Sequence, residues 1–285
     1  MQNIDENTIT DAAIESFSGC TDERLKFLLT KLVEHLHEFS REVRLTEEEW
    51  FKAIEFLTGT GHITDEKRQE FILLSDTLGL TMLVTALNNN KPQECTEASV
   101  LGPFFVEGAP EFENGADIGE GAEGESCWVD CRVLDVEGQP VAGATVDVWE
   151  TDVNGYDVQQ DVDGPLARGR LKTSVDGRFN FWAVLPVAYT VPHDGPVGRM
   201  LDATRRHPWR PGHLHFLIAA PGYERLVTQL FRGDDQYLDS DAVFGVRSSL
   251  VADWDRYEAG TAPDGTECKE PFYTLNYDFV LNRDS

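Results

Sequence analysis

The stretch RPGHLHFLIA, residues 210–219, decides how the second half of this chain folds. An apolar run follows a Pro-Gly turn signal and predicts a strand from His213 to Ala219. Since side chains two positions apart in a strand share a face, His213 and His215 direct two imidazoles toward one point. Imidazole is the commonest metal ligand in proteins. The alternative is two polar residues on a solvated strand face, and the strand alone does not exclude it.

The bulk composition is that of an acidic globular protein. The 285 residues carry 51 acidic and 24 basic side chains, a net charge of −27, and 41% of the residues are hydrophobic. This length allows one large domain or two smaller ones with a sizeable core. Because the negative charge repels phosphate backbones and anionic membranes, we expect no nucleic acid partner.

Cysteine use and hydropathy predict a cytoplasmic protein. The five cysteines are odd in number and form no Cys-x-x-Cys pair, so we expect neither a disulfide framework nor a thiolate zinc site. Residues 1–10 are polar and acidic and lack the features of a signal peptide. No uninterrupted apolar stretch approaches about 18 residues, so we expect no membrane insertion.

Roughly the first 90 residues have the apolar spacing of helices. In residues 25–43 the apolar side chains follow one helix face. Thr46 and Glu49 form a capping-box pattern that opens a second helix. A third helix is predicted to begin after Thr64 and to run toward Leu87.

Strand-like alternation takes over in the second half of the chain. A segment rich in Gly and Glu, residues 107–126, precedes it and is expected to be an exposed loop. Short strands with turn signals indicate a β-sandwich, and helices followed by strands indicate an α+β protein. We expect a helical domain with its linker at residues 1–105 and a mainly antiparallel β-sandwich domain at residues 106–285. The predicted strands are 128–136, 145–150, 178–185, 213–219, 226–231 and 274–281.

Two imidazoles do not define a metal. Zinc takes three or four protein ligands, and non-haem Fe(II) takes two histidines and a carboxylate. Further ligands must come from the many carboxylates or from tyrosines. Tyr156 and Tyr189 each follow a predicted strand and lie in a turn-rich loop. Either can equally be a packed aromatic whose hydroxyl finds a partner, and periodicity does not decide between the two interpretations.

Four runs of sequence carry a specific resemblance. They are LGPFF (101–105), PHDGPVGRML (192–201), RHPWRPGHLHF (206–216) and YLDSDAVFGV (237–246). In these runs the chain resembles the intradiol ring-cleaving dioxygenases, the family of catechol and hydroxyquinol 1,2-dioxygenases. The similarity spans nearly the whole chain, is densest at residues 95–105 and 149–246, and is strongest to the hydroxyquinol-cleaving members.

The resemblance implies a mononuclear Fe(III) site, one per chain, and its chemistry. The implied ligands are Tyr156, Tyr189, His213 and His215. A small aromatic diol or triol and O2 are the implied substrates, and Tyr189 is the ligand that leaves the metal when the substrate binds. By the same pattern, Arg210 stabilises negative charge on the ring, and Gln229 hydrogen-bonds near the iron. From the residues alone, Arg210 can also be a surface arginine in a local basic run.

Matching the family's pocket positions implies an apolar substrate pocket with few polar groups. Asp76 stands on an otherwise apolar helix face, where it can accept a hydrogen bond from a third ring hydroxyl and favour hydroxyquinol over catechol. The alternative is an aspartate on the helix surface. The implied substrate-binding residues are Leu73, Asp76, Val100, Leu101, Gly102, Pro103, Phe104, Val191, Pro192 and Val243.

The resemblance also assigns roles to the two domains. The helical domain is implied to form a homodimer with a phospholipid-filled groove at the interface, and the β-sandwich is implied to be catalytic. The apolar face of residues 25–43 fits that role, or packing against the β-sandwich. Three functions remain open: hydroxyquinol cleavage, catechol or chlorocatechol cleavage within the same family, and a non-catalytic β-sandwich binding module with a helical dimerisation arm.

Overall fold

Helices make up the first part of the chain, as their apolar spacing predicts. The computed structural model describes residues 4–66, 68–102, 105, 107–151 and 167–284. The chain divides into two compact units, Met1–Gly59 and Thr60–Ser285. The division between these compact units falls after Gly59. The predicted domain boundary after residue 105 stays a prediction. The helices before the first strand are α1 (Ile9–Glu15), α2 (Glu23–Glu42), α3 (Glu47–His62), α4 (Glu70–Thr77) and α5 (Leu80–Asn88).

The capping box predicted at Thr46 is confirmed. The hydroxyl of Thr46 accepts a hydrogen bond from the amide of Glu49 at 3.2 Å. In return, Oε2 of Glu49 accepts one from the amide of Thr46 at 2.9 Å. The pair satisfies two amides that the start of α3 leaves without helical partners.

The prediction of one continuous third helix is wrong. The segment forms two helices, α4 and α5, which are bent by 78° relative to each other. Gly79 separates them with a φ of 75°, and its amide donates to the carbonyl of Asp76 at 2.9 Å. This left-handed conformation commonly ends helices and favours a residue without Cβ. The apolar periodicity on both sides of Gly79 concealed the break.

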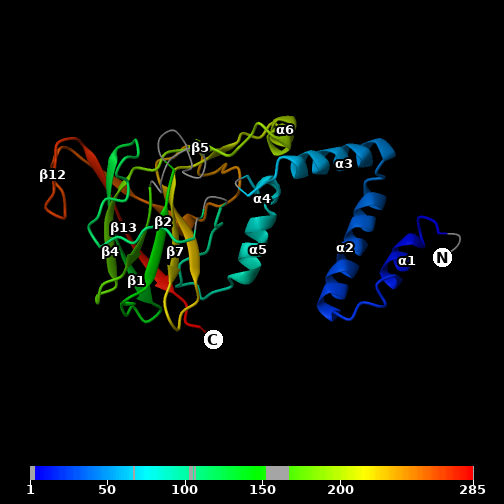
Figure 1. Ribbon diagram of the computed structural model, residues 1–285, viewed down its shortest axis with the longest axis horizontal. Helices are drawn as coiled ribbons and strands as arrows, with labels where there is room; N and C mark the ends of the chain where they lie inside the picture. Colours follow the sequence, from blue (N-terminus) through cyan, green and yellow to red (C-terminus); the bar gives the residue numbers. More distant parts are fainter. Residues whose placement is uncertain (1–3, 67, 103–104, 106, 152–166, 285) are drawn as a thin grey trace. The chain divides into compact units, whose positions relative to one another are not determined.

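Two sheets pack face to face in the unit Thr60–Ser285 (Figure 1). One sheet has the order β10-β13-β1-β4 and the other β3-β2-β7-β8-β9. Among the described strands, only β1–β13 and β8–β9 pair in parallel. The predicted α+β protein with a mainly antiparallel β-sandwich is therefore confirmed. The strands are β1 (Ser126–Asp135), β2 (Thr145–Trp149), β3 (Arg168–Lys172), β4 (Arg178–Val184), β5 (Tyr189–Thr190), β6 (Trp209–Arg210), β7 (His213–Ala219), β8 (Leu226–Arg232), β9 (Val251–Ala252), β10 (Trp254–Tyr257), β11 (Gly260–Thr261), β12 (Glu267–Cys268) and β13 (Phe272–Leu281).

Alternating apolar side chains fill the space between the two sheets. The ring of Phe216 on β7 lies 4.8 Å from that of Phe279 on β13 and 6.2 Å from that of Phe179 on β4, measured between centroids. Since β7 belongs to one sheet and β4 and β13 to the other, these contacts join both sheets in one core. Cys127 and Cys131 of β1 are also buried in that core.

The segment at residues 107–126 is not the fully exposed loop that its composition predicts. Ile118 is buried, and its amide donates to the carbonyl of Trp182 on β4 at 2.9 Å. Phe112 packs against the core, and its amide donates to the carbonyl of Arg170 on β3 at 2.8 Å. Isolated apolar side chains therefore attach this segment to the sandwich, although its glycines and glutamates suggest a linker.

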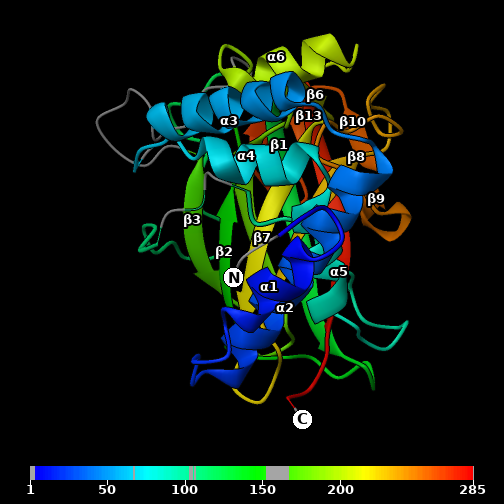
Figure 2. The same ribbon diagram turned by 90° about the vertical axis from the view of Figure 1, so that its right-hand side faces the viewer.

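Short elements gather at the end of the sandwich where β7 begins. Helix α6 (Pro196–Ala203) and β5 lie there (Figure 1), and a second view shows α6 with β6 and α4 (Figure 2). Pro196 occupies the first turn of α6, where its missing amide hydrogen has no cost. Among the described residues, no single helix is long and apolar enough to cross a membrane, and only α4 and α5 taken together reach that composition.

Candidate active site

The two histidines of β7 face each other in the protein interior. His213 is 3% exposed and His215 4% exposed, and their Nε2 atoms lie 3.1 Å apart. The interpretation of the pair as a solvated strand face is therefore wrong. Neighbouring strands hold the rings in place. Trp149 of β2 pairs with His215 and stacks on its ring at 4.7 Å, and Phe231 of β8 pairs with His213.

The surroundings of the pair set its protonation. Nδ1 of His213 lies 2.7 Å from the carbonyl oxygen of Pro211. Because a carbonyl only accepts, Nδ1 donates and Nε2 keeps its lone pair. Burial lowers the pKa of both imidazoles well below the usual value, and the positive charge of Arg210 lowers it further. Both rings are thus neutral at physiological pH, which is the form that binds a metal.

Arg210 is the centre of the polar network. It is 3% exposed, so its interpretation as a surface arginine is wrong. It lies on β6 directly opposite Tyr189 of β5. Its Nη1 donates to the hydroxyl of Tyr189 at 3.3 Å and lies 3.0 Å from Nε2 of His213. Burial acts to lower the pKa of Arg210, but the carboxylate of Asp241 and the hydroxyl of Tyr189 together outweigh this and raise it.

Gln229 of β8 links three parts of the site. Its Oε1 accepts a hydrogen bond from Nη2 of Arg210 at 2.9 Å. Its Nε2 donates to the carbonyl of Val100 at 2.7 Å and lies 3.2 Å from Nδ1 of His215. The side chain is fully buried, so these contacts fix its orientation. Arg210, a histidine of β7 and the segment ending at Gly102 are therefore connected through one amide.

Gly102 brings the backbone against the histidine pair. A Cβ at this position would lie 3.3 Å from Cε1 of His215, and the backbone φ of 76° is one that favours glycine. The other predicted pocket residues differ in burial. Those that are buried are Leu73, Asp76, Val100, Val191 and Val243, whereas Leu101 is 37% exposed and Pro192 is half-buried. Pro103, Phe104 and Tyr156 lie outside the described residues.

Asp76 is buried on α4, so its interpretation as a helix-surface aspartate is wrong. Its Oδ1 has no hydrogen-bond partner among the described residues. Burial raises the pKa of its carboxyl, and Thr81 and the positive charge of Arg210 partly oppose this rise. A buried acceptor without a partner is costly, and a donor from a bound ligand would remove that cost.

The donor set fits a metal ion. Two imidazole nitrogens that share one ion at about 2.1 Å each are separated by roughly 3 Å. The observed separation between Nε2 of His213 and Nε2 of His215 is 3.1 Å. Within the described part of the chain, no group of three or more His, Cys, Asp and Glu side chains can hold a metal. A further donor among the described residues would therefore come from another residue type, and the hydroxyl of Tyr189, which shares Nη1 of Arg210 with His213, is such a donor in this network.

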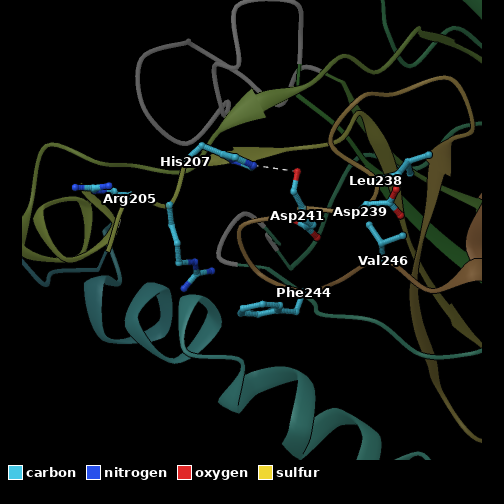
Figure 3. A pocket seen from close by; sticks show the side chains of 9 residues that line it. Arg205, His207, Leu238, Asp239, Asp241, Phe244 and Val246 are labelled. Carbon is cyan, nitrogen blue, oxygen red and sulfur yellow. Dashed lines mark hydrogen bonds between the residues drawn. The ribbon is translucent and has the colours of Figure 1, made fainter. Parts of the chain in front are cut away.

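Sequence reasoning missed Asp241, which anchors Arg210. Its Oδ1 accepts from Nε of Arg210 at 2.9 Å and its Oδ2 from Nη2 at 3.2 Å. The same carboxylate accepts from the amides of Val243 and Gly245 at 3.3 and 2.8 Å. A cavity of about 490 Å³ opens beside Asp241 (Figure 3). The residue stands in the run YLDSDAVFGV, but nothing in that run indicates a partner 31 residues earlier.

Comparison with known proteins defines the class of this protein. Residues 100–283 match the family model described as "Dioxygenase", and residues 22–96 match "Catechol dioxygenase N terminus". A β-sandwich with a buried histidine pair, preceded by this helical region, is thus the arrangement of a ring-cleaving oxidoreductase. The two matches meet between residues 96 and 100, at the segment that contacts Gln229.

Individual relatives agree over the full length. A 6-chlorohydroxyquinol 1,2-dioxygenase of Cupriavidus pinatubonensis is 54% identical over 99% of both chains. A hydroxyquinol 1,2-dioxygenase of Nocardioides simplex is 50% identical over 98% of this chain and 96% of its own. The solved structure of a Pseudomonas putida hydroxyquinol 1,2-dioxygenase superposes with a TM-score of 0.90 at 48% identity, covering 98% of this chain and 99% of the other. The chain belongs to the intradiol ring-cleaving dioxygenases, an iron-dependent family.

Proposed function

We propose that this protein cleaves hydroxyquinol (1,2,4-trihydroxybenzene) with O2. The bond between the two carbons that bear adjacent hydroxyls breaks and both oxygen atoms enter the product, 3-hydroxy-cis,cis-muconate, the enol form of maleylacetate. The observation that carries the choice of substrate is the buried Oδ1 of Asp76, which has no hydrogen-bond partner in the described part of the chain. The names of the relatives point to the same class of trihydroxylated ring.

The site would hold one Fe(III) per chain through Tyr156, Tyr189, His213 and His215. Ferric iron, when bound, supplies a Lewis acid that orients the two adjacent ring oxygens and makes the ring reactive toward O2. Tyrosinate oxygens are hard anionic donors and suit this ion better than the ferrous form. The two imidazoles contribute neutral nitrogens, since burial keeps their pKa low.

The residues around the site organise charge and protons. Nη1 of Arg210 is held between His213 and Tyr189, so its positive charge is fixed where negative charge develops on a deprotonated ring. When Tyr189 is held as a tyrosinate, its oxygen can take up a proton from a substrate hydroxyl and become the hydroxyl that accepts the hydrogen bond from Arg210. Burial of the network excludes water and strengthens these interactions.

Asp76 gives the pocket a reason to prefer a third hydroxyl. A site built to hydrogen-bond a substrate hydroxyl rejects the analogue that lacks it, because the buried acceptor is then left unpaired. Oδ1 of Asp76 is such an acceptor, and the positive charge of Arg210 acts on the pKa of the same carboxyl. Catechol leaves this oxygen without a donor, whereas hydroxyquinol supplies one.

Metal analysis and visible spectroscopy test the iron assignment. We expect about one iron per chain and a wine-red colour from tyrosinate-to-iron charge transfer. His215→Ala removes one ligand and should lose both iron and colour, whereas the exposed His193→Ala should retain both. A colourless wild-type protein filled with zinc would overturn the iron assignment.

Substrate profiling tests the assignment of hydroxyquinol. We expect wild-type kcat/KM to favour hydroxyquinol over catechol, and Asp76→Ala to reduce this preference roughly tenfold to hundredfold, the range for a hydrogen bond to a charged group. Asp202→Ala removes an exposed carboxylate from α6 and serves as the control that should leave the preference unchanged. A wild-type preference for catechol or a chlorocatechol would refute the choice of substrate.

Exposed apolar side chains in the unit Met1–Gly59 support the proposal of a homodimer with bound phospholipid. Apolar side chains that follow one face of α2 and its C-cap residue are about half exposed, namely Leu25, Leu28, Leu32, Leu36, Phe39 and Val43. Such a stripe is typical of an interface that a second chain or lipid covers. Light scattering should give the mass of a dimer, and solvent extraction followed by mass spectrometry should release phospholipid.

The five cysteines, all free, support the proposal that the protein works in the cytoplasm.

A further inference from the structure

Arg206 is one of the residues that line the cavity of Figure 3. Its Nη1 donates to the carbonyl of Thr77 at 2.5 Å, and its Nη2 donates to the carbonyl of Ala242 at 2.9 Å. Thr77 follows Asp76 at the end of α4, and Ala242 precedes Val243 in the loop after Asp241. One guanidinium therefore connects α4, which carries the proposed substrate-binding carboxylate of Asp76, to the loop that carries Val243.

The hydrogen bond from Arg206 to the carbonyl of Thr77 caps the C-terminus of α4. The last carbonyls of a helix have no partners within the helix, and a cationic side chain that binds them also interacts favourably with the helix dipole. The start of α4 is fixed as well, because Oε1 of the buried Glu70 accepts from the amide of Val197 on α6 at 3.1 Å. The amide of Arg206 itself bonds to the carbonyl of Leu201 on α6 at 2.9 Å. Helix α4 is thus held at both ends from α6 and the residues that follow it.

The loop after Asp241 has a strained backbone at Phe244, next to Arg206. It has a φ of 58°, which is unusual for a bulky residue, and its side chain is half exposed. The guanidinium of Arg206 lies 4.9 Å from the centroid of its ring. A Cβ on Gly79 would lie 3.4 Å from Cδ2 of the same ring, so Phe244 covers the corner between α4 and α5 (Figure 3). The guanidinium of Arg206 and the backbone at Gly79 therefore both lie next to this ring.

We propose that Arg206 is a positioning residue that sets the separation between Asp76 on α4 and Val243 on the facing loop, and that it thereby tunes selectivity for the third ring hydroxyl. The inference rests on the proposed function, since it assigns Asp76 to the substrate. Arginine is suited to this bridge because its planar fork directs two donors at two carbonyls, whereas the ammonium of lysine is a single point of charge. The guanidinium touches neither histidine, so its effect on the ring passes through Asp76 and Val243.

The test compares Arg206→Lys and Arg206→Ala with wild type on hydroxyquinol and catechol. For Arg206→Lys we expect KM for hydroxyquinol to rise about tenfold with kcat within about twofold, and KM for catechol to change far less. Arg206→Ala should show a larger change in the same direction, so lysine gives partial rescue. Phe244→Ala keeps both hydrogen bonds and should give a smaller change. Arg205→Ala removes an exposed charge one residue away and should leave both substrates unaffected.

Two readouts separate positioning from a general loss of structure. Iron content and the visible absorption band should equal those of wild type in Arg206→Lys. Hydrogen exchange of the Gly79 amide, which is bonded to the carbonyl of Asp76, should be faster in the metal-free variant because the end of α4 is released. Equal losses on both substrates, or unchanged KM values with unchanged exchange, would overturn the inference. A wild-type preference for catechol would refute the proposed function instead, while a change in the ratio of the two KM values would still support the role of Arg206.

Discussion

Removing the carboxylate of Asp241 is predicted to destabilise the protein strongly. The guanidinium of Arg210 and the carboxylate of Asp241 are both almost fully buried and joined by hydrogen bonds of 2.9 and 3.2 Å. Asp241→Ala leaves a buried positive charge without this partner, and it also leaves the amides of Val243 and Gly245 unpaired. Breaking a buried pair on one side costs about 3–5 kcal/mol, and we expect a loss in that range.

Asp241→Asn should cost less stability than Asp241→Ala, but still about 2 kcal/mol. The geometry of the hydrogen bonds explains this remaining cost. Oδ1 accepts from Nε of Arg210 and from the amide of Val243, and Oδ2 accepts from Nη2 of Arg210 and the amide of Gly245. Whichever way the asparagine amide is turned, its NH2 group faces two donors. Asp239→Ala is the matched control, because Asp239 is exposed at the rim of the same cavity and should change stability by less than about 0.5 kcal/mol.

Urea unfolding of metal-free protein at neutral pH, followed by tryptophan fluorescence, measures these differences. Five of the six tryptophans belong to Thr60–Ser285, and Trp50 is the sixth, so the signal reports the unit that contains Asp241. If Asp241→Ala unfolded within about 1 kcal/mol of wild type with an unchanged m-value, the argument that this pair is essential to the folded site would be refuted.

Two further substitutions test other parts of the structure. Glu150 is buried, its Oε2 has no hydrogen-bond partner among the described residues, and burial raises its pKa well above the usual value. Between the unfolded pKa and that raised value, the folded protein holds a proton that the unfolded chain has lost, so stability falls as pH rises. Glu150→Gln should remove this loss, about 1.4 kcal/mol for each pH unit inside that window, in urea unfolding measured over a pH series. Gly102→Ala places a Cβ 3.3 Å from His215 in a left-handed backbone, and should lower kcat/KM at least tenfold and reduce iron content. Wild-type iron content and kcat/KM in that variant would contradict the close approach.

The parts of the structure that sequence predicts well depend on local patterns. Strand β7 has the bounds that the apolar run predicts, from His213 to Ala219. The period of two residues placed His213 and His215 on one face, and their Nε2 atoms lie 3.1 Å apart. The capping box at Thr46 needed only a residue three positions later. In each case the residues that determine the structure are neighbours in the chain.

The parts that sequence could not predict depend on contacts between distant residues. Strand β1 pairs in parallel with β13, and the Arg132–Asp278 ion pair across them joins positions 146 residues apart. No local signal indicates which strand will be the neighbour. Asp241 is likewise assigned only by the fold, because its partner Arg210 lies on a two-residue strand in a different part of the chain. Gly79 did carry a local signal, but a single glycine in an apolar run can equally be a tolerated helix residue.

The geometry of the histidine pair follows from the packing of the sandwich. On β7, Leu214, Phe216 and Ile218 point into the core between the sheets, so the intervening residues His213 and His215 must point the other way. A slip of one residue would exchange the two sets and bury imidazoles among the phenylalanines, which makes the register strongly determined. Since the apolar contacts of one face set the register, they also set the positions of the imidazoles on the other. The separation that suits two ligands of one ion is therefore a property of the folded chain, and a metal bound there would meet a site that the core has already arranged.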